Sequence, residues 1–383
     1  MTQPTQPTQP TQPTQPTQPT QPTQPPAQGD SAGEASPAAY GQEDPTGLPL
    51  DPLRAFLAEH VPGLLEGPLT ARLIAGGKSN LTYVVGDGHR EVIVRRPPLG
   101  HVLATAHDMV REHRVISALR DTDVPVPETY AVCPGDGVIG APFYVMELAP
   151  GTPYRLAAEL EALGPERTRA ISERMVDTLV ALHAVDPEAV GLGDFGRPQG
   201  FLERQVRRWK QQLDGSRSRE VAGIDELHAW LAGNVPPESP PAIVHGDFRL
   251  DNLLIDTHDG DDRVTAVLDW EMATLGDPLT DVGLLQVYQA LSGMGGGAGV
   301  SDVALAPGWL GPEEIRDRYA AGSGRDLGEL SFHLGLAYFK LAVILEGIHY
   351  RYTHGQTVGE GFASIGAAVE PLVAAGLAAV KDQ

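Results

Sequence analysis

The sequence predicts an α+β protein with a small β-rich N-terminal lobe and a larger, mainly helical C-terminal lobe. Three observations lead to this prediction. The chain has 383 residues, which is more than an average single domain holds. Short β-branched runs are concentrated before residue 150, whereas apolar patterns with helical spacing follow it. The glycine- and proline-containing segment Pro150–Pro153 predicts a hinge between the two lobes.

A repetitive tail precedes the predicted lobes. Residues 2–25 are eight tandem Thr-Gln-Pro triplets, and the small, polar run Ala27–Tyr40 follows. Proline at every third position favours an extended, polyproline-like coil. Because the tail has no apolar side chains to bury, it cannot offset the entropy of ordering. We expect residues 1–42 to be a disordered spacer, in preference to a proline-rich docking ligand.

The N-terminal lobe is predicted over residues 43–150. Two β-branched runs flank the hairpin signal Gly86–Arg90. A helix follows, because apolar residues near helical spacing occur between Ala106 and Arg120. The strands expected in this lobe are Leu81–Val85, Glu91–Arg95, Thr129–Cys133 and Phe143–Leu148.

The C-terminal lobe is predicted over residues 151–383. Arg167–His183 has an apolar stripe at helical spacing, which predicts an amphipathic helix. Two strands are expected within the helical body, Asn252–Ile255 and Val264–Leu268. Further helices are expected at Phe201–Leu213, Ile224–Leu231, Glu313–Ala320, Glu329–Tyr352 and Val358–Val380.

Composition narrows the possible partners and the cellular compartment. The formal net charge of −22 argues against nucleic acid and against anionic membrane surfaces. The single cysteine, Cys133, excludes an internal disulfide and a multi-cysteine zinc site. The most apolar segment, Leu330–Leu345, is interrupted by His333 and Lys340, so a buried helix is expected there. A reducing cytoplasm is the compartment that these features favour.

One short segment carries the strongest chemical signal. His245-Gly246-Asp247 is followed by Asn252, and Asp269 ends an apolar run shortly afterwards. The interval from Asp247 to Asn252 equals that between aspartate and asparagine in the catalytic loop of kinases. Phosphoryl transfer needs a carboxylate to accept the proton of the attacking hydroxyl, and oxygen ligands for Mg²⁺. The sequence therefore predicts a small-molecule kinase that uses ATP and Mg²⁺. The N-terminal lobe is expected to bind the nucleotide, and the C-terminal lobe is expected to carry the catalytic loop and the substrate site.

These motifs also resemble a known family. The chain resembles the aminoglycoside phosphotransferase-like superfamily, which is related to choline and homoserine kinases, at His245–Asn252, Leu268–Glu271 and Gly276–Asp281. Within this superfamily, the chain resembles a subgroup that also occurs fused to acyl-CoA dehydrogenases. The matching segments are Gly76–Asn80, Phe143–Gly151, Leu182–Asp186 and Gly191–Gly196. The resemblance runs from about Leu69 to Gln356 and implies a protein-kinase-like two-lobe fold.

The resemblance implies a role for each matching position. Asp247 would be the catalytic base, Asn252 and Asp269 would hold magnesium, and Asp281 would brace the catalytic loop. Arg95 stands where the family usually has an ATP-binding lysine, with Glu112 as its expected partner. The remaining residues expected to contact the nucleotide are Gly76, Gly77, Ser79 and Asn80 in a turn over the phosphates, and Met146, Glu147 and Leu148 at the adenine.

Several alternatives stay open at this level. A P-loop at Gly77-Lys78-Ser79 is rejected, because Arg72 stands where that motif needs glycine. His245 is expected to pack beneath the loop and bond to the backbone, in preference to acting as a base. The acceptor is expected to be a hydroxyl of a small molecule, of the hydroxyacyl-CoA type. The alternatives are an aminoglycoside or amino-alcohol acceptor, and a pseudokinase that binds nucleotide without turnover.

Overall fold

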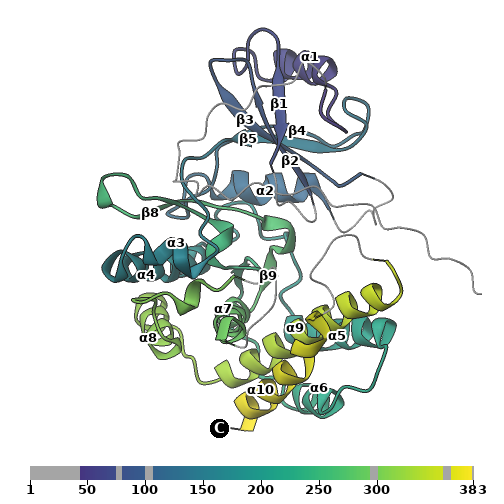
Figure 1. Cartoon of the computed structure of the whole chain (residues 1–383), viewed down its shortest axis with the longest axis vertical. Coiled ribbons are helices and arrows are strands. Elements are labelled where there is room, and N and C mark those ends of the chain that lie inside the picture. Colours follow the sequence, from purple (N-terminus) through teal and green to yellow (C-terminus); the bar gives the residue numbers. More distant parts are fainter. Residues whose placement is uncertain (1–43, 75–79, 100–106, 294–300, 357–363, 382–383) are drawn as a thin grey trace, which may run out of the picture. The chain divides into compact units, whose positions relative to one another are not determined.

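The computed structural model describes residues 44–74, 80–99, 107–293, 301–356 and 364–381. The tail predicted over residues 1–42 lies outside these ranges. Figure 1 shows a sheet with two helices in the N-terminal part of the described chain and a helical body in the C-terminal part. The predicted fold class, a β-rich lobe followed by a larger helical lobe, is confirmed.

The N-terminal lobe is a five-stranded antiparallel sheet with the order β1-β2-β3-β5-β4. Helix α1 and strand β1 were not predicted, whereas the hairpin of β2 and β3 was. The elements are α1 (Leu50–His60), β1 (Thr70–Leu73), β2 (Leu81–Gly86), β3 (Glu91–Arg96), α2 (Met109–Leu119), β4 (Thr129–Cys133) and β5 (Phe143–Glu147).

Alternation along the strands gives the sheet two different faces. On β3, Val92 and Val94 pack in the cluster that includes Leu53 and Phe56 of α1. Ile93 belongs to the opposite cluster, together with residues of α2. Because side chains alternate across a strand, Arg95 is on the face of Ile93, which is the face toward α2.

The C-terminal lobe is built from helices with two small two-stranded antiparallel sheets, β6 with β9 and the hairpin of β7 with β8. Its helices are α3 (Ala157–Glu161), α4 (Pro165–Ala184), α5 (Phe201–Ser216), α6 (Ile224–Gly233), α7 (Leu279–Gly293), α8 (Pro312–Ser323), α9 (Leu330–Thr353) and α10 (Val369–Lys381). Its strands are β6 (Ala242–Val244), β7 (Leu253–Asp256), β8 (Arg263–Val267) and β9 (Thr274–Gly276).

The helix predicted over Val358–Val380 is wrong in its first part. Among the described residues there, Ile365–Ala368 forms a 3₁₀ turn and α10 begins only at Val369. Pro371 explains this start, because a proline ring collides with the carbonyl four residues earlier and is tolerated only in the first helical turn. The preceding part of the predicted helix, residues 358–363, lies outside the described residues.

Within the described ranges, α9 is the one helix long and apolar enough to cross a membrane. Of its most apolar window, 61% is buried inside the protein, and α9 packs against α7 and α10. This is the environment of a core helix, as the sequence predicted for Leu330–Leu345.

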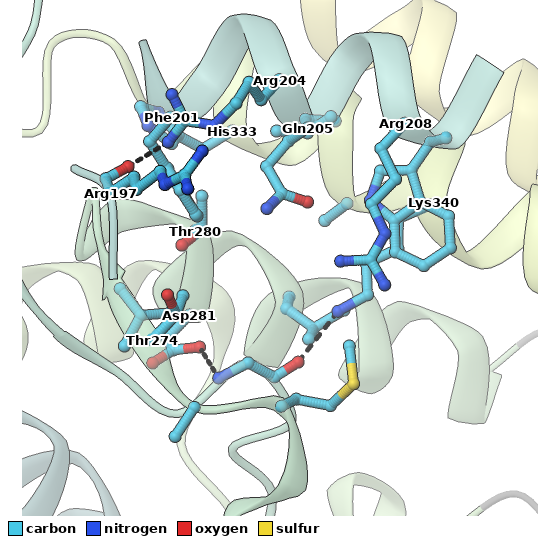
Figure 2. Close-up of a pocket in the computed structure, with 18 of the residues that line it drawn as sticks. Arg197, Phe201, Arg204, Gln205, Arg208, Thr274, Thr280, Asp281, His333 and Lys340 are labelled. Atoms are coloured by element: carbon cyan, nitrogen blue, oxygen red, sulfur yellow. Dashed lines mark hydrogen bonds between the residues drawn. The ribbon is translucent and has the colours of Figure 1, made fainter. Parts of the chain in front are cut away.

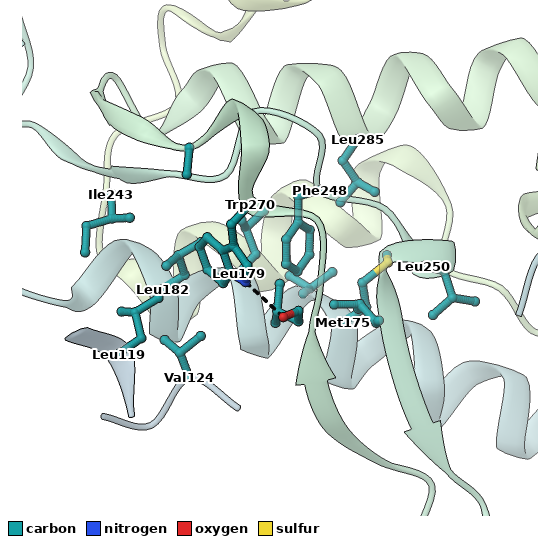
Figure 3. Close-up of a cluster of buried hydrophobic side chains, with 14 of the residues drawn as sticks. Leu119, Val124, Met175, Leu179, Leu182, Ile243, Phe248, Leu250, Trp270 and Leu285 are labelled. Carbon is teal, nitrogen blue, oxygen red and sulfur yellow. Dashed lines mark hydrogen bonds between the residues drawn. The ribbon is translucent and has the colours of Figure 1, made fainter. Parts of the chain in front are cut away.

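A continuous hydrophobic cluster lies beneath the segments that carry the predicted site. It includes Leu119 of α2, Leu179 of α4, and Phe248 and Trp270 on either side of the β7–β8 hairpin (Figure 3). The Trp270 indole is 1% exposed and donates to the carbonyl of Val267 at 2.9 Å. The packing of these side chains fixes the backbone on which Asp247 and Asp269 stand.

The loop after β6 is held by a buried carboxylate at the start of α7. Asp281 accepts the N–H of His245 at 2.7 Å and the N–H of Gly246 at 2.8 Å, and it lies 3.3 Å from His183 Nε2. Burial opposes ionisation of Asp281, but the hydrogen bonds from His183 and Gly246 and the nearby His245 outweigh it and lower the pKa. The charged carboxylate therefore stabilises the loop.

Replacing this carboxylate by an amide, Asp281→Asn, should lower the free energy of unfolding near neutral pH by about 2–3 kcal/mol, because the amide leaves a buried donor unsatisfied. A carboxyl whose folded pKa is lowered stabilises the fold above its unfolded pKa of about 4. That contribution is lost as the pH falls through the folded pKa. Urea unfolding should thus show a constant difference between the two proteins above about pH 5 and a shrinking one below it.

The exposed Asp51 of α1 provides a control, since Asp51→Asn should change the free energy of unfolding by less than about 0.5 kcal/mol. A difference between wild type and Asp281→Asn that did not depend on pH would contradict this account of the loop.

Candidate active site

The three core residues predicted from the sequence line one cleft. A cavity of about 560 Å³ opens between the sheet and the loop after β6, and Asp247, Asn252 and Asp269 all contribute to its wall. Arg95 and Met146 line it from the sheet. In the described ranges, no group of three or more histidine, cysteine, aspartate or glutamate side chains could hold a metal. A carboxylate and an amide that leave the remaining positions to water and phosphate suit Mg²⁺.

Asp247 is held at both of its carboxylate oxygens. Asn252 donates its Nδ2 to the Asp247 carbonyl at 2.8 Å and to Oδ2 at 3.2 Å. The hydroxyl of Tyr288 on α7 donates to Oδ1 at 2.5 Å. Burial and the charge of Asp247 raise the pKa of Tyr288 well above its ordinary value, so the phenol stays protonated and is the donor. Both bonds from Asn252 use Nδ2, so its Oδ1 is available to a ligand.

Asp269 stands at the end of β8 in an unusual conformation. Its φ of 64° and ψ of 59° place it in the left-handed region, which is costly for a residue with a side chain. The following turn is anchored by the buried Trp270. The Asp269 carboxylate lies 2.5 Å from a terminal nitrogen of Arg95.

Arg95 joins two carboxylates across the cleft. Its Nε is 3.0 Å from Oε2 of Glu112 on α2, and the same oxygen accepts from the Tyr144 hydroxyl at 3.1 Å. Burial opposes the charge of Arg95, but Tyr144, Glu112 and Asp269 raise its pKa. The guanidinium is thus charged. The predicted pairing of Arg95 with Glu112 is present, and the pair extends to Asp269, which the sequence did not indicate.

The expected nucleotide residues are described only in part. Met146, Glu147 and Leu148 line the cleft where β5 ends. Gly76, Gly77 and Ser79 lie outside the described residues. Asn80, just before β2, is 1% exposed and donates to Glu112 at 3.0 Å and to Glu271 at 3.3 Å. Its amide therefore ties the start of β2 to α2 and to the segment after Asp269.

His245 lies beneath the loop and does not face the cleft. The ring is fully buried, its centroid is 4.8 Å from that of Trp270, and Nε2 is 2.9 Å from the Leu268 carbonyl. Its Nδ1 accepts from the Asp247 N–H at 3.3 Å. Both ring nitrogens thus bond to the backbone, which agrees with the packing role expected for this histidine.

Sequence reasoning missed three side chains that surround Asp247. Arg249 lies with its guanidinium carbon 5.1 Å from the Tyr288 ring centroid and bonds to Asp251 at 2.5 Å. Tyr288 is 41 residues from Asp247, on a helix that was not predicted. Local spacing could not find it. The two charges flanking Leu250 were the only available signal for the Arg249–Asp251 pair.

A second cavity adjoins the first at the loop after β6. It has a volume of about 440 Å³, and Gly246 lines it, whereas the next residue, Asp247, lines the first cavity. Figure 2 shows its wall, formed by α5, by α9 and by segments near Thr274 and Thr280. Its cationic side chains are Arg111, Arg197, Arg204, Arg208 and Lys340.

The chain is similar in sequence to members of the acyl-CoA dehydrogenase family. The chain is 34% identical over 337 residues to acyl-CoA dehydrogenase family member 11 from Gallus gallus, and the match covers 85% of this chain and 42% of that protein. It is 34% identical over 312 residues to acyl-CoA dehydrogenase family member 10 from Mus musculus, covering 81% of this chain and 29% of that protein. The chain thus spans less than half the length of either relative.

A solved structure covers nearly the same region. The crystal structure of a protein from Ralstonia eutropha, provisionally assigned as an aminoglycoside phosphotransferase, has a TM-score of 0.76 and 33% identity, and the match covers 87% of this chain and 98% of that one. The model of the phosphotransferase enzyme family matches residues 70–333, which include parts of both lobes and every described residue of the cleft named above. The chain belongs to this phosphotransferase enzyme family and is a small-molecule kinase.

Proposed function

We propose that the chain transfers the γ-phosphoryl group of ATP, with Mg²⁺, to a hydroxyl of a small acyl thioester of the hydroxyacyl-CoA type. The observation that carries the proposal is the convergence of Asp247, Asn252 and Asp269 on one cleft. The geometry supports a division of labour in which one carboxylate serves the acceptor and the other oxygen ligands serve the donor.

Asp247 would accept the proton of the acceptor hydroxyl. The hydroxyl oxygen then forms a bond to the γ-phosphorus, the bond from that phosphorus to the bridging oxygen breaks, and ADP leaves with the electron pair. Tyr288 and Asn252 fix the carboxylate of Asp247, which keeps the proton acceptor in one orientation.

The donor side of the cleft suits a metal–triphosphate complex. Asn252 Oδ1 and the Asp269 carboxylate would hold Mg²⁺, and Arg95 supplies a guanidinium beside them. A bound magnesium ion would neutralise the charge that develops on the phosphate oxygens. Glu112 and Asp269 favour the charged form of Arg95. The contacts of Arg95 with both carboxylates hold its guanidinium at the cleft.

Two observations support an acyl thioester as acceptor. A kinase region within a member of the acyl-CoA dehydrogenase family would meet acyl thioesters, and phosphorylation would turn a hydroxyl of such a chain into a leaving group. The cavity beside the catalytic loop is rich in cationic side chains, which repel a polycationic acceptor. We propose a cytoplasmic location for this reaction.

An aminoglycoside or amino-alcohol is the second candidate, favoured by the likeness to the protein from Ralstonia eutropha. A cationic acceptor needs acidic side chains around it. The described acidic residues of the second cavity are Glu271 and Asp281. Both are engaged within the protein, Glu271 with Asn80 and Asp281 with the loop after β6.

The deciding experiment measures ATP consumption with hydroxyacyl-CoAs, aminoglycosides and choline-like alcohols. We expect turnover with hydroxyacyl-CoAs. Turnover confined to aminoglycosides or amino-alcohols would replace the proposed acceptor, and ATP binding without turnover on any member would overturn the proposed reaction.

Asp247→Asn should lower kcat by about 10²–10⁴-fold, because it removes the proton acceptor and keeps the size of the side chain. Calorimetric titration with AMP-PNP should show nucleotide affinity within a few-fold of wild type. The exposed loop residue Asp261 offers a control, since Asp261→Asn should retain full turnover. Wild-type turnover in Asp247→Asn would remove Asp247 from its proposed role.

Asp269→Ala or Asn252→Ala should raise the magnesium concentration needed for half-maximal rate by about tenfold or more, because each removes an oxygen ligand. Electron paramagnetic resonance with Mn²⁺ and AMP-PNP gives a readout apart from turnover, and we expect weaker Mn²⁺ binding in both variants. Metal binding equal to wild type in both variants would refute the ligand assignment.

Tyr288→Phe should lower kcat by about tenfold and leave the KM for ATP within a few-fold of wild type, because it removes one of the two contacts that orient the Asp247 carboxylate. The substitution removes only the hydroxyl that donates to Asp247. A purely structural role for Tyr288 would instead lower the melting temperature and leave kcat unchanged in the folded enzyme.

A further inference from the structure

The second cavity is basic although the whole chain is strongly acidic. The formal net charge is −22, yet Arg111, Arg197, Arg204, Arg208 and Lys340 all line this hollow. Figure 2 shows Arg208 and Lys340 at one end, Arg197 and Arg204 at the other, and Gln205 between them. Gathering like charges in one cavity is unfavourable unless something compensates them.

The described residues supply little of this compensation. Arg204 donates to the carbonyls of Gln199 and Arg197, and Lys340 donates to the carbonyl of Gly246 at 2.8 Å. Two of the other three, Arg197 and Arg208, have fewer contacts still. Within the ranges that the structure describes, neither has a hydrogen bond or an ion pair from its side chain.

Arg111 also lines the cavity, and its side chain forms hydrogen bonds to carbonyl oxygens only. It donates to Phe195 at 2.5 Å and to Ala273 at 3.0 Å. Carbonyl dipoles satisfy hydrogen-bond donors but do not neutralise a full charge. None of the cavity's arginines, nor Lys340, forms an ion pair with a carboxylate in the described part of the chain.

The pKa of Lys340 shows the effect of this uncompensated positive charge. Burial lowers its pKa, and nearby Arg208 acts in the same direction, whereas Asp247 and Asp281 oppose them. An anion bound beside Lys340 and Arg208 would favour the charged ammonium. The cavity also has an apolar wall that includes Phe201, Trp209 and Leu336, so it suits a ligand with an anionic end and an apolar part.

We propose that this cavity binds the phosphate and pyrophosphate groups of the acceptor, with Arg208 and Lys340 at one end and Arg197 at the other, and that it thereby selects phosphorylated thioester carriers. The inference rests on the proposed function, since the cavity meets the nucleotide cleft at the Gly246–Asp247 step of the catalytic loop. Several guanidinium groups match a polyvalent anion better than they match a single carboxylate.

The test compares the binding of CoA with that of pantetheine, which has the same thiol arm without phosphates. AMP-PNP fills the nucleotide cleft during calorimetric titration, so only the second cavity is sampled. We expect CoA to bind at least about tenfold more tightly, because charge-assisted hydrogen bonds to phosphate are made only by CoA. Inorganic pyrophosphate should compete with CoA.

The variants Arg197→Gln and Arg208→Gln should bring the preference for CoA over pantetheine toward one, with wild-type melting temperatures, because neither side chain bonds to the described protein. Arg207→Gln is the matched control: Arg207 is adjacent on α5 but lines a separate surface hollow with Lys210 and His228. It should keep the full preference.

Equal binding of CoA and pantetheine to wild type, or a preference unchanged in both variants, would overturn the proposal. Pyrophosphate binding that depends on Arg208 without any preference for CoA would instead identify a site for a free anion, and would also overturn it. Because these titrations need no turnover, they separate this inference from the proposed reaction. A failure to consume ATP with hydroxyacyl-CoAs would refute the proposed reaction but would not contradict the proposed phosphate site.

Discussion

The site depends on a buried carboxylate that never faces the cleft. Asp281 accepts two backbone N–H groups of the loop after β6, and this anchors the residue next to them, Asp247, at the meeting point of two cavities. Because His245 and Asp281 are buried, those N–H groups would otherwise lack a partner, which would cost free energy. His183 and His245 lie against the same carboxylate, which keeps it charged. One ionised side chain thus fixes the position of another that is proposed to do the chemistry.

The sequence predicted the parts of the site that depend on short intervals. Asp247 and Asn252 are five positions apart in the chain, so their spacing can be recognised from the sequence alone. Tyr288 did not, because its bond to Asp247 depends on how α7 is placed. Helix α7 is buried on several sides, with Val282, Leu284 and Leu285 all in the core, so it shows no single apolar stripe to predict it.

Net charge illustrates a second limit of composition. The value of −22 predicts that a large polyanion such as nucleic acid is an unsuitable partner. It carried no information about the cavity beside the catalytic loop, where cations from α5 and α9 meet. The two helices are far apart in sequence, and only the fold brings Arg208 near Lys340. Long-range repulsion depends on the sum of charges, whereas recognition of a small ligand depends on the few that line its pocket.

The geometry of the cleft also suits arginine at position 95, where the family resemblance led us to expect a lysine. A lysine offers one point charge, whereas the guanidinium of Arg95 contacts Glu112 through Nε and Asp269 through a terminal nitrogen at the same time. Asp269 stays in a costly left-handed conformation because Trp270, buried and bonded to the Val267 carbonyl, fixes the turn after it. The cleft therefore presents its charges in a fixed arrangement without a ligand, and electrostatic stabilisation of phosphoryl transfer works best from groups that need not reorganise.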